Sequence, residues 1–231
     1  MDKRVCVLIG VLALLPACGG GGSTPNSPTP PPTTTPPANR NPVINSISVT
    51  PTFGIAALTT FSFSSSASDP DSDTLTYAWD LAGNARTGAA QTIVFSSGGN
   101  GIGTLTVTDG RGGSATQSVN FVSGTGSGTW TGNLPLAEGP RPITAALTQS
   151  TTSGAITGNW SLPARGVVGN LDPASPNAID ANGRVVIRFK VTSGGTFNDF
   201  TFTGQLQTTG TSIVGSVSGS GFAGQAVTLT K

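Results

Sequence analysis

Residues 67–80 read Ala-Ser-Asp-Pro-Asp-Ser-Asp-Thr-Leu-Thr-Tyr-Ala-Trp-Asp, and this stretch decides the first half of the fold. Its aspartates and proline predict a turn, because Asx side chains cap backbone amides and proline presets φ. Leu75, Tyr77 and Trp79 then alternate with polar residues, which is typical of a strand with one buried face. Similar short runs, separated by Gly, Ser, Asn and Asp, fill the chain beyond Pro42 without any helical period. We therefore expect an all-β protein.

The acidic turn, the alternating run after it and the later segment Leu105-Thr-Val-Thr-Asp-Gly resemble PKD domains. The resemblance covers residues 43–123 and implies an immunoglobulin-like β-sandwich of about seven strands. The family's Trp-Asp-Phe-Gly-Asp-Gly motif is here Trp-Asp-Leu-Ala-Gly-Asn over residues 79–84, and the fold should survive that change. PKD domains mostly serve as spacers or interaction modules in surface and secreted proteins. The resemblance therefore implies an architecture and no particular activity.

Asp69, Asp71 and Asp73 place three carboxylates at alternate positions of the turn, where hard oxygen ligands could hold Ca²⁺. An EF-hand is excluded, because Thr74 stands where that loop needs glycine and a strand, not a helix, follows. The alternative is a solvated turn whose aspartates cap backbone amides. Both interpretations stay open, and a weak calcium site is the one cofactor that the sequence suggests.

Residues 124–231 form a second predicted domain, which begins with the Gly-rich boundary Gly-Thr-Gly-Ser-Gly. Four of its runs have the pattern apolar-x-Gly-x-apolar, with glycines at Gly132, Gly158, Gly204 and Gly215. Because side chains alternate across a strand, each glycine shares the buried face with its apolar neighbours. Glycine within a strand usually marks a sharp bend or a close backbone approach. We therefore expect a small antiparallel barrel of about eight strands.

The start of this domain, Gly128-Thr-Trp130, is loosely similar to the Gly-x-Trp opening of lipocalin- and avidin-like barrels. A barrel of this size encloses either packed side chains or one small ligand. Trp130 and Trp160 are the candidate ligand-binding residues if the interior is open, and core residues if it is filled. The sequence leaves these alternatives unresolved.

The N-terminus has a basic start, Met1 to Arg4, and then an apolar run from Val5 to Leu15. That run is shorter than the roughly 20 residues that a helix needs to cross a bilayer, and the pattern is typical of a secretion signal. The following Leu-Pro-Ala-Cys resembles the lipobox of bacterial lipoproteins. The resemblance implies a signal peptide over residues 1–17, cleaved before Cys18, which then carries the lipid.

Residues 18–42 hold four consecutive glycines and then a segment rich in proline and threonine, which predicts a disordered linker or stalk. With the domains described above, the expected architecture is an immunoglobulin-like sandwich followed by a small barrel on this stalk. The lipobox resemblance implies a lipid-anchored protein of the bacterial cell envelope, on the outer membrane or the cell surface. The membrane is then one partner, reached through the lipid anchor.

The composition excludes several classes of function. Only 9% of the residues are charged, the net charge is +1 and there is no histidine. A net charge of +1 indicates no basic patch for binding nucleic acid. Without histidine, the chain cannot form a histidine-dependent catalytic triad or the usual zinc sites. We expect a non-catalytic lipoprotein that presents a binding or spacing module to an envelope protein or a glycan. The alternative is a carrier of a small hydrophobic ligand in the barrel.

Overall fold

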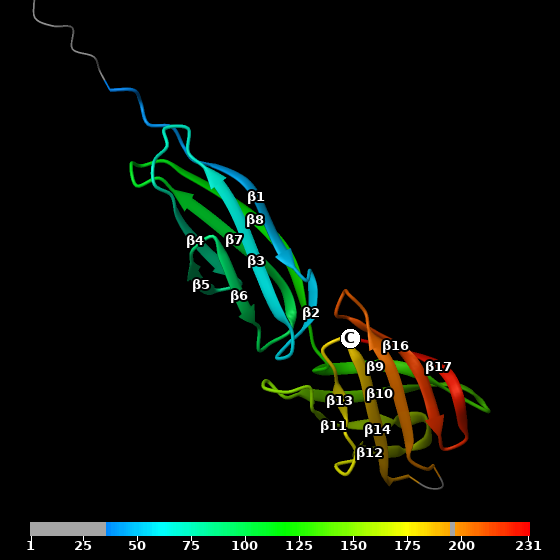
Figure 1. Ribbon diagram of the computed structural model, residues 1–231. Helices are drawn as coiled ribbons and strands as arrows, with labels where there is room; N and C mark the ends of the chain where they lie inside the picture. The colour runs from blue at the N-terminus through cyan, green and yellow to red at the C-terminus, as the bar shows by residue number, and fades with distance from the viewer. Residues whose placement is uncertain (1–35, 195–196) are drawn as a thin grey trace, which may run out of the picture. The chain divides into compact units, whose positions relative to one another are not determined.

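The computed structural model describes residues 36–194 and 197–231. The predicted signal peptide (1–17), the predicted lipidation site Cys18 and the linker up to residue 35 lie outside the described residues. Throughout the described ranges the chain is built from β-strands, apart from the short 3₁₀ turn η1 (Pro163–Arg165) (Figure 1). Within the same ranges, no helix is long and apolar enough to span a membrane. The predicted all-β class is confirmed.

The first domain is an immunoglobulin-like β-sandwich, as predicted. Its strands are β1 (Val43–Thr50), β2 (Phe53–Ile55), β3 (Thr60–Ser68), β4 (Thr76–Leu81), β5 (Asn84–Thr87), β6 (Ala90–Val94), β7 (Gly99–Thr108) and β8 (Ser114–Gly124). One sheet has the order β1-β3-β6 and the other β2-β8-β7-β4-β5. Strands β2 and β8 run parallel, and the other neighbours run antiparallel.

Aromatic side chains fill the space between the two sheets. Phe95 stacks on Phe121 with ring centroids 4.7 Å apart, and Phe63 meets Trp79 edge-on at 5.7 Å. The Trp79 indole N–H donates to the carbonyl of Gly88 at 3.1 Å, so this buried polar group is satisfied. The inward positions that the alternation predicted thus form a single core.

The outer faces of the sandwich carry hydroxyl groups that are paired across neighbouring strands. On one sheet the hydroxyls of Ser48 and Ser64 lie 2.8 Å apart across β1 and β3. On the other sheet Thr104 and Ser118 lie 3.0 Å apart across β7 and β8. These hydrogen bonds link neighbouring strands on the solvent-facing side of each sheet, whereas apolar packing links the two sheets on the inside.

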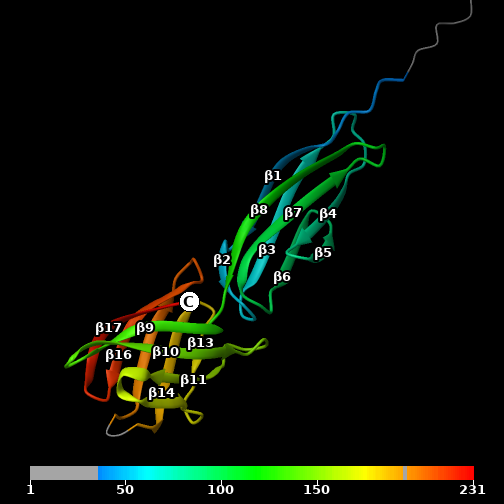
Figure 2. The ribbon, with the colours of Figure 1, turned by 180° about the vertical axis from the view of Figure 1, so that it is seen from behind.

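The second domain is a closed antiparallel barrel of eight strands, also as predicted. Its elements are β9 (Gly128–Leu136), β10 (Gly139–Gln149), β11 (Ile156–Leu162), β12 (Val167–Leu171), β13 (Ala178–Ile179), β14 (Arg184–Ser193), β15 (Phe200–Leu206), β16 (Ser212–Gly219) and β17 (Phe222–Thr230). Consecutive strands pair around the barrel, β17 returns to β9, and β12 pairs with β14. The short strand β13 pairs with β14 along the same edge as β12 does, but closer to the start of β14. Figure 2 shows the barrel from behind.

Close approach of a neighbouring backbone explains the glycine in three of the four apolar-x-Gly-x-apolar runs, and a core side chain explains the fourth. A Cβ at Gly132 would lie 2.5 Å from the carbonyl oxygen of Thr228 on β17. Added Cβ atoms at Gly158 and Gly215 would overlap carbonyl oxygens on β10 and β15. Gly204 pairs directly with Gly215, and a Cβ there would press on the ring of Phe202. The four glycines therefore let neighbouring backbones and core side chains pack without a gap.

The sandwich also contributes to the core of the barrel. Ile55 of β2 is fully buried in the barrel's apolar cluster, against which Phe53 and Leu58 also pack. The buried side chain of Gln149 on β10 donates to the carbonyl of Ala56 at 2.8 Å and accepts from the amide of Gly126, also at 2.8 Å. Residues 38–231 accordingly form one compact unit.

Replacing Gly215 by alanine should destabilise the barrel, because the new methyl group would overlap the backbone of β15. We expect the free energy of unfolding to fall by about 1–3 kcal/mol, the usual range for overpacking. The measurement is denaturant unfolding followed by tryptophan fluorescence. The control is Val214→Thr, an exposed and β-branched neighbour on the same strand, which should change stability by less than about 0.5 kcal/mol. Equal stability of the two variants would contradict the close-approach explanation.

Candidate functional site

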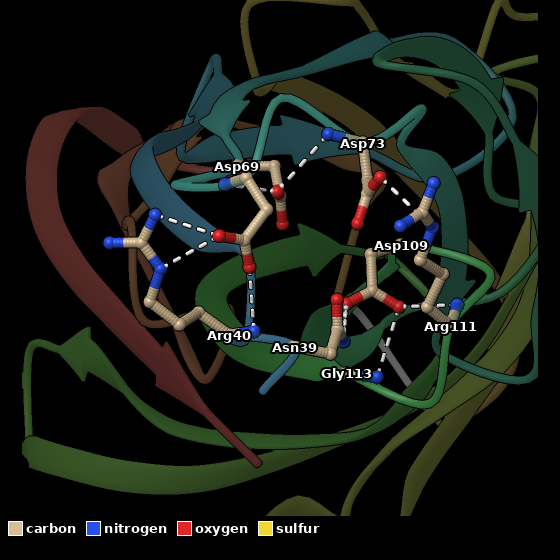
Figure 3. A network of polar contacts seen from close by, with 8 residues as sticks. Asn39, Arg40, Asp69, Asp73, Asp109, Arg111 and Gly113 are labelled. Carbon is tan, nitrogen blue, oxygen red and sulfur yellow. Dashed lines mark hydrogen bonds and ion pairs between the residues drawn. The ribbon is translucent and has the colours of Figure 1, made fainter. Parts of the chain in front are cut away.

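Most of the charged side chains of the sandwich gather where two loops and the N-terminal segment meet (Figure 3). One loop joins β3 to β4 and carries Asp69, Asp71 and Asp73; the other joins β7 to β8 and begins at Asp109. Thr76 at the start of β4 pairs with Thr108 at the end of β7. This register brings the two loops side by side, and we call the resulting group of side chains the acidic cluster.

Each loop is built around one aspartate that caps its backbone. Asp69 accepts the amide N–H groups of Asp71 at 2.8 Å and Asp73 at 3.1 Å through the same oxygen, Oδ1. Asp109 does the same for Arg111 at 2.7 Å and Gly113 at 2.9 Å. Both loops therefore follow from the tendency of aspartate to bond the backbone a few residues further on.

The N-terminal segment is fastened to these loops. The side-chain amide of Asn39 donates to Asp109 Oδ2 at 2.7 Å. The Arg40 guanidinium donates from Nε to Asp71 Oδ1 at 2.9 Å, and its backbone N–H donates to Asp71 Oδ2 at 2.8 Å. Residues 39 and 40, which the sequence analysis assigned to the linker, thus contact both loops.

The surroundings favour the ionised form of two carboxyl groups. The hydrogen bonds from the side chain and backbone of Arg40 hold the pKa of Asp71 below its ordinary value. The pKa of Asp109 is also lowered, first by the Asn39 amide and then by the backbone N–H of Arg111. Arg111 in turn pairs with Asp73, with its Nε 3.1 Å from Oδ1.

Two carboxylate oxygens of the acidic cluster have no hydrogen-bond partner. They are Asp69 Oδ2 and Asp73 Oδ2, and both are buried. The Asp73 side chain is only 9% exposed. One ligand oxygen each from Asp69, Asp71 and Asp73 can be chosen so that all three lie within 4.8 Å of one another. The structure therefore brings together the three aspartates that the sequence analysis selected.

Four further residues belong to this cluster that were not predicted from the sequence: Asn39, Arg40, Asp109 and Arg111. Asp109 and Arg111 lie in a turn that the sequence displays clearly, but their neighbours depend on the pairing of β4 with β7. Arg40 is the only charged residue of the predicted linker (18–42), and this charge was the one sequence signal that set it apart; Asn39 carried no such signal.

The other predicted site residues, Trp130 and Trp160, lie inside the barrel. Their side chains are 0% and 2% exposed. The indole N–H of Trp130 donates to the carbonyl of Gly126 at 2.8 Å, and that of Trp160 to the carbonyl of Lys190 at 3.1 Å. Trp160 also meets Phe189 and Phe200 edge-on, with ring centroids 5.5 and 5.2 Å apart. Both tryptophans pack in the core with their polar atoms satisfied.

The sandwich matches a known family of protein domains. Residues 39–123 match the family described as the PKD domain, as the stretch at 67–80 predicted, and this match includes Asn39 and Arg40. No curated protein matches the chain significantly. A structural match comes from work on the promiscuous specificity of carbohydrate-binding modules of the β-sandwich superfamily, with 17% identity and a TM-score of 0.36. The alignment covers 66% of this chain and 59% of that one, so the chain spans less than two thirds of this neighbour's length.

Replacing Arg40 by glutamine should raise the pKa of Asp71 toward its ordinary value, because the guanidinium is the main cause of the lowering. A ¹³C NMR titration of the carboxyl groups in metal-free buffer measures this directly. Asp109 is the internal control, since Asn39 and the backbone hold its pKa down and remain in place. An unchanged Asp71 pKa in the variant would contradict the pairing with Arg40.

Proposed function

We propose that this protein is a non-catalytic lipoprotein of the bacterial cell envelope that presents its PKD domain and barrel as one binding or spacing module. The observation that carries the proposal is the joint packing of the two domains, with Ile55 of the sandwich buried in the core of the barrel. Modules that share a core keep a fixed relation to each other, which suits a spacer. The absence of histidine from the whole sequence supports a role without general-base catalysis.

The surface of the sandwich bears on the kind of partner. Neutral hydroxyl pairs such as Ser48 with Ser64 and Thr104 with Ser118 lie on both sheets. A face of this kind suits a neutral polar partner, either an envelope protein or a glycan, better than a polyanion such as nucleic acid. Affinity capture from envelope extract and binding to a glycan array distinguish the two classes of partner.

The lipid anchor is tested at Cys18. In a bacterial host that lipidates proteins, the wild-type chain should fractionate with membranes and incorporate labelled fatty acid, because acyl chains on Cys18 anchor it. The Cys18→Ser variant should incorporate no label. Cys6→Ser serves as the matched control, since Cys6 lies within the predicted signal peptide and would be removed. Equal labelling of wild type and Cys18→Ser would refute the proposed anchor.

The packed interior of the barrel supports an interaction module over a carrier of hydrophobic ligands. Trp130 and Trp160 are buried against other side chains and their indole N–H groups bond to backbone carbonyls. Fatty acids, quinones and sterol-like compounds should therefore leave the tryptophan emission unchanged. A saturable change in emission with any of these compounds would favour the carrier instead.

A further inference from the structure

We propose that the acidic cluster binds one Ca²⁺ ion, held by Asp69 and Asp73 with Asp109, Asp71 and the Asn39 amide around it. This inference goes beyond the proposed function, because neither a spacer nor a binding module requires a metal. Figure 3 shows the carboxylates of Asp69, Asp73 and Asp109 and the side chain of Asn39 turned toward a common space between the loops. Three separate segments of the sandwich supply these groups.

The charge balance of the cluster favours a divalent cation. The cluster holds four carboxylates, those of Asp69, Asp71, Asp73 and Asp109. The two guanidinium groups in it belong to Arg40, which pairs with Asp71, and Arg111, which pairs with Asp73. With all of these groups ionised, a net charge of −2 is left uncompensated. One Ca²⁺ ion would neutralise it.

The unpartnered oxygens provide an independent argument. Asp69 Oδ2 and Asp73 Oδ2 are buried and accept no hydrogen bond, although buried carboxylate oxygens in folded proteins are nearly always satisfied. The Asp73 side chain is more than nine-tenths buried, and Arg111 occupies only its other oxygen. A cation between these two oxygens would satisfy both of them at once.

A comparison within the chain separates a metal site from an ordinary capped turn. Asp180 in the barrel accepts the amides of Asn182 and Arg184 through Oδ1, both at 2.9 Å, as Asp69 does for its own loop. Asp180, however, is exposed, and neither of its oxygens is among the buried unpartnered atoms. Backbone capping therefore accounts for Asp180 completely but leaves the second oxygens of Asp69 and Asp73 unexplained.

The chemistry of the donors selects the ion. All of the groups offered are carboxylate or amide oxygens, which Ca²⁺ and Mg²⁺ prefer, whereas Zn²⁺ prefers nitrogen and sulfur. Ca²⁺ accepts six to eight oxygens in flexible geometry and suits ligands drawn from loops, whereas Mg²⁺ demands a near-ideal octahedron. By analogy with extracellular modules, we expect a Kd of about 0.1–1 mM for Ca²⁺.

The primary experiment is calorimetric titration of the purified full-length chain with CaCl₂ after removal of metal with EGTA. We expect one site per chain and, at ten times the Kd, a rise in Tm of about 2–5 °C. MgCl₂ at the same concentrations should give a smaller shift. If 10 mM CaCl₂ produces neither heat nor a change in Tm, the proposal is wrong.

Matched variants locate the site. Asp73→Asn and Asp69→Asn should each weaken Ca²⁺ binding by about tenfold or more, because each removes one charged ligand. Asp180→Asn, which alters a capping aspartate outside the cluster, should bind Ca²⁺ as the wild type does. Equal affinity in all three variants would overturn the assignment.

NMR of the wild type keeps the test valid even if a variant fails to fold. On addition of CaCl₂, the amide signals of residues 39–41, 69–75 and 109–113 should shift together. Shifts confined to other parts of the chain would overturn the proposed location.

Discussion

Close approach of neighbouring backbones at inward-facing glycines is the constraint on which the barrel depends. At Gly132, Gly158 and Gly215 a side chain would collide with a carbonyl oxygen of the adjacent strand, so each position tolerates hydrogen alone. Gly204, which pairs with Gly215, is crowded instead by the side chains of Phe202 and Ile213. Eight strands can then close around a narrow interior that large side chains fill. Trp130, Trp160 and the phenylalanines of β14 and β15 occupy that space, and this filled core underlies the proposed role as an interaction module.

In the acidic cluster, local hydrogen bonding determines where the charges lie. Asp69 and Asp109 each use one oxygen to cap a loop, and this fixes the direction of the second oxygen. The pairing of β4 with β7 then places the loops together, and Asn39 and Arg40 fasten the N-terminal segment to them. The hydrogen bonds that stabilise the two loops therefore also bring four carboxylates close together. This arrangement supports the proposed cation site.

Much of this fold could be predicted from sequence, because strand alternation and the position of glycines are local signals. The alternating run ending at Trp79 predicted a strand of the sandwich, and the glycine pattern predicted a closed barrel. Two features depend on contacts between distant residues and could not be predicted. Ile55 belongs by sequence to the sandwich but lies in the core of the barrel, because β2 pairs with the last residues of β8. Asp109 joins the other aspartates only through the register of β4 and β7.

The hydroxyl pairs on the outer faces have a consequence for how the protein responds to its surroundings. Dissolved salt screens the attraction between exposed charges but has little effect on hydrogen bonds between neutral groups. The hydroxyl pairs Ser48–Ser64 and Thr104–Ser118 should therefore respond little to salinity. Sensitivity to ionic strength is concentrated at the few exposed ion pairs, such as Arg40 with Asp71. When the ionic strength changes, the sandwich therefore keeps these hydroxyl pairs, and its response is concentrated in the ion pairs of the acidic cluster.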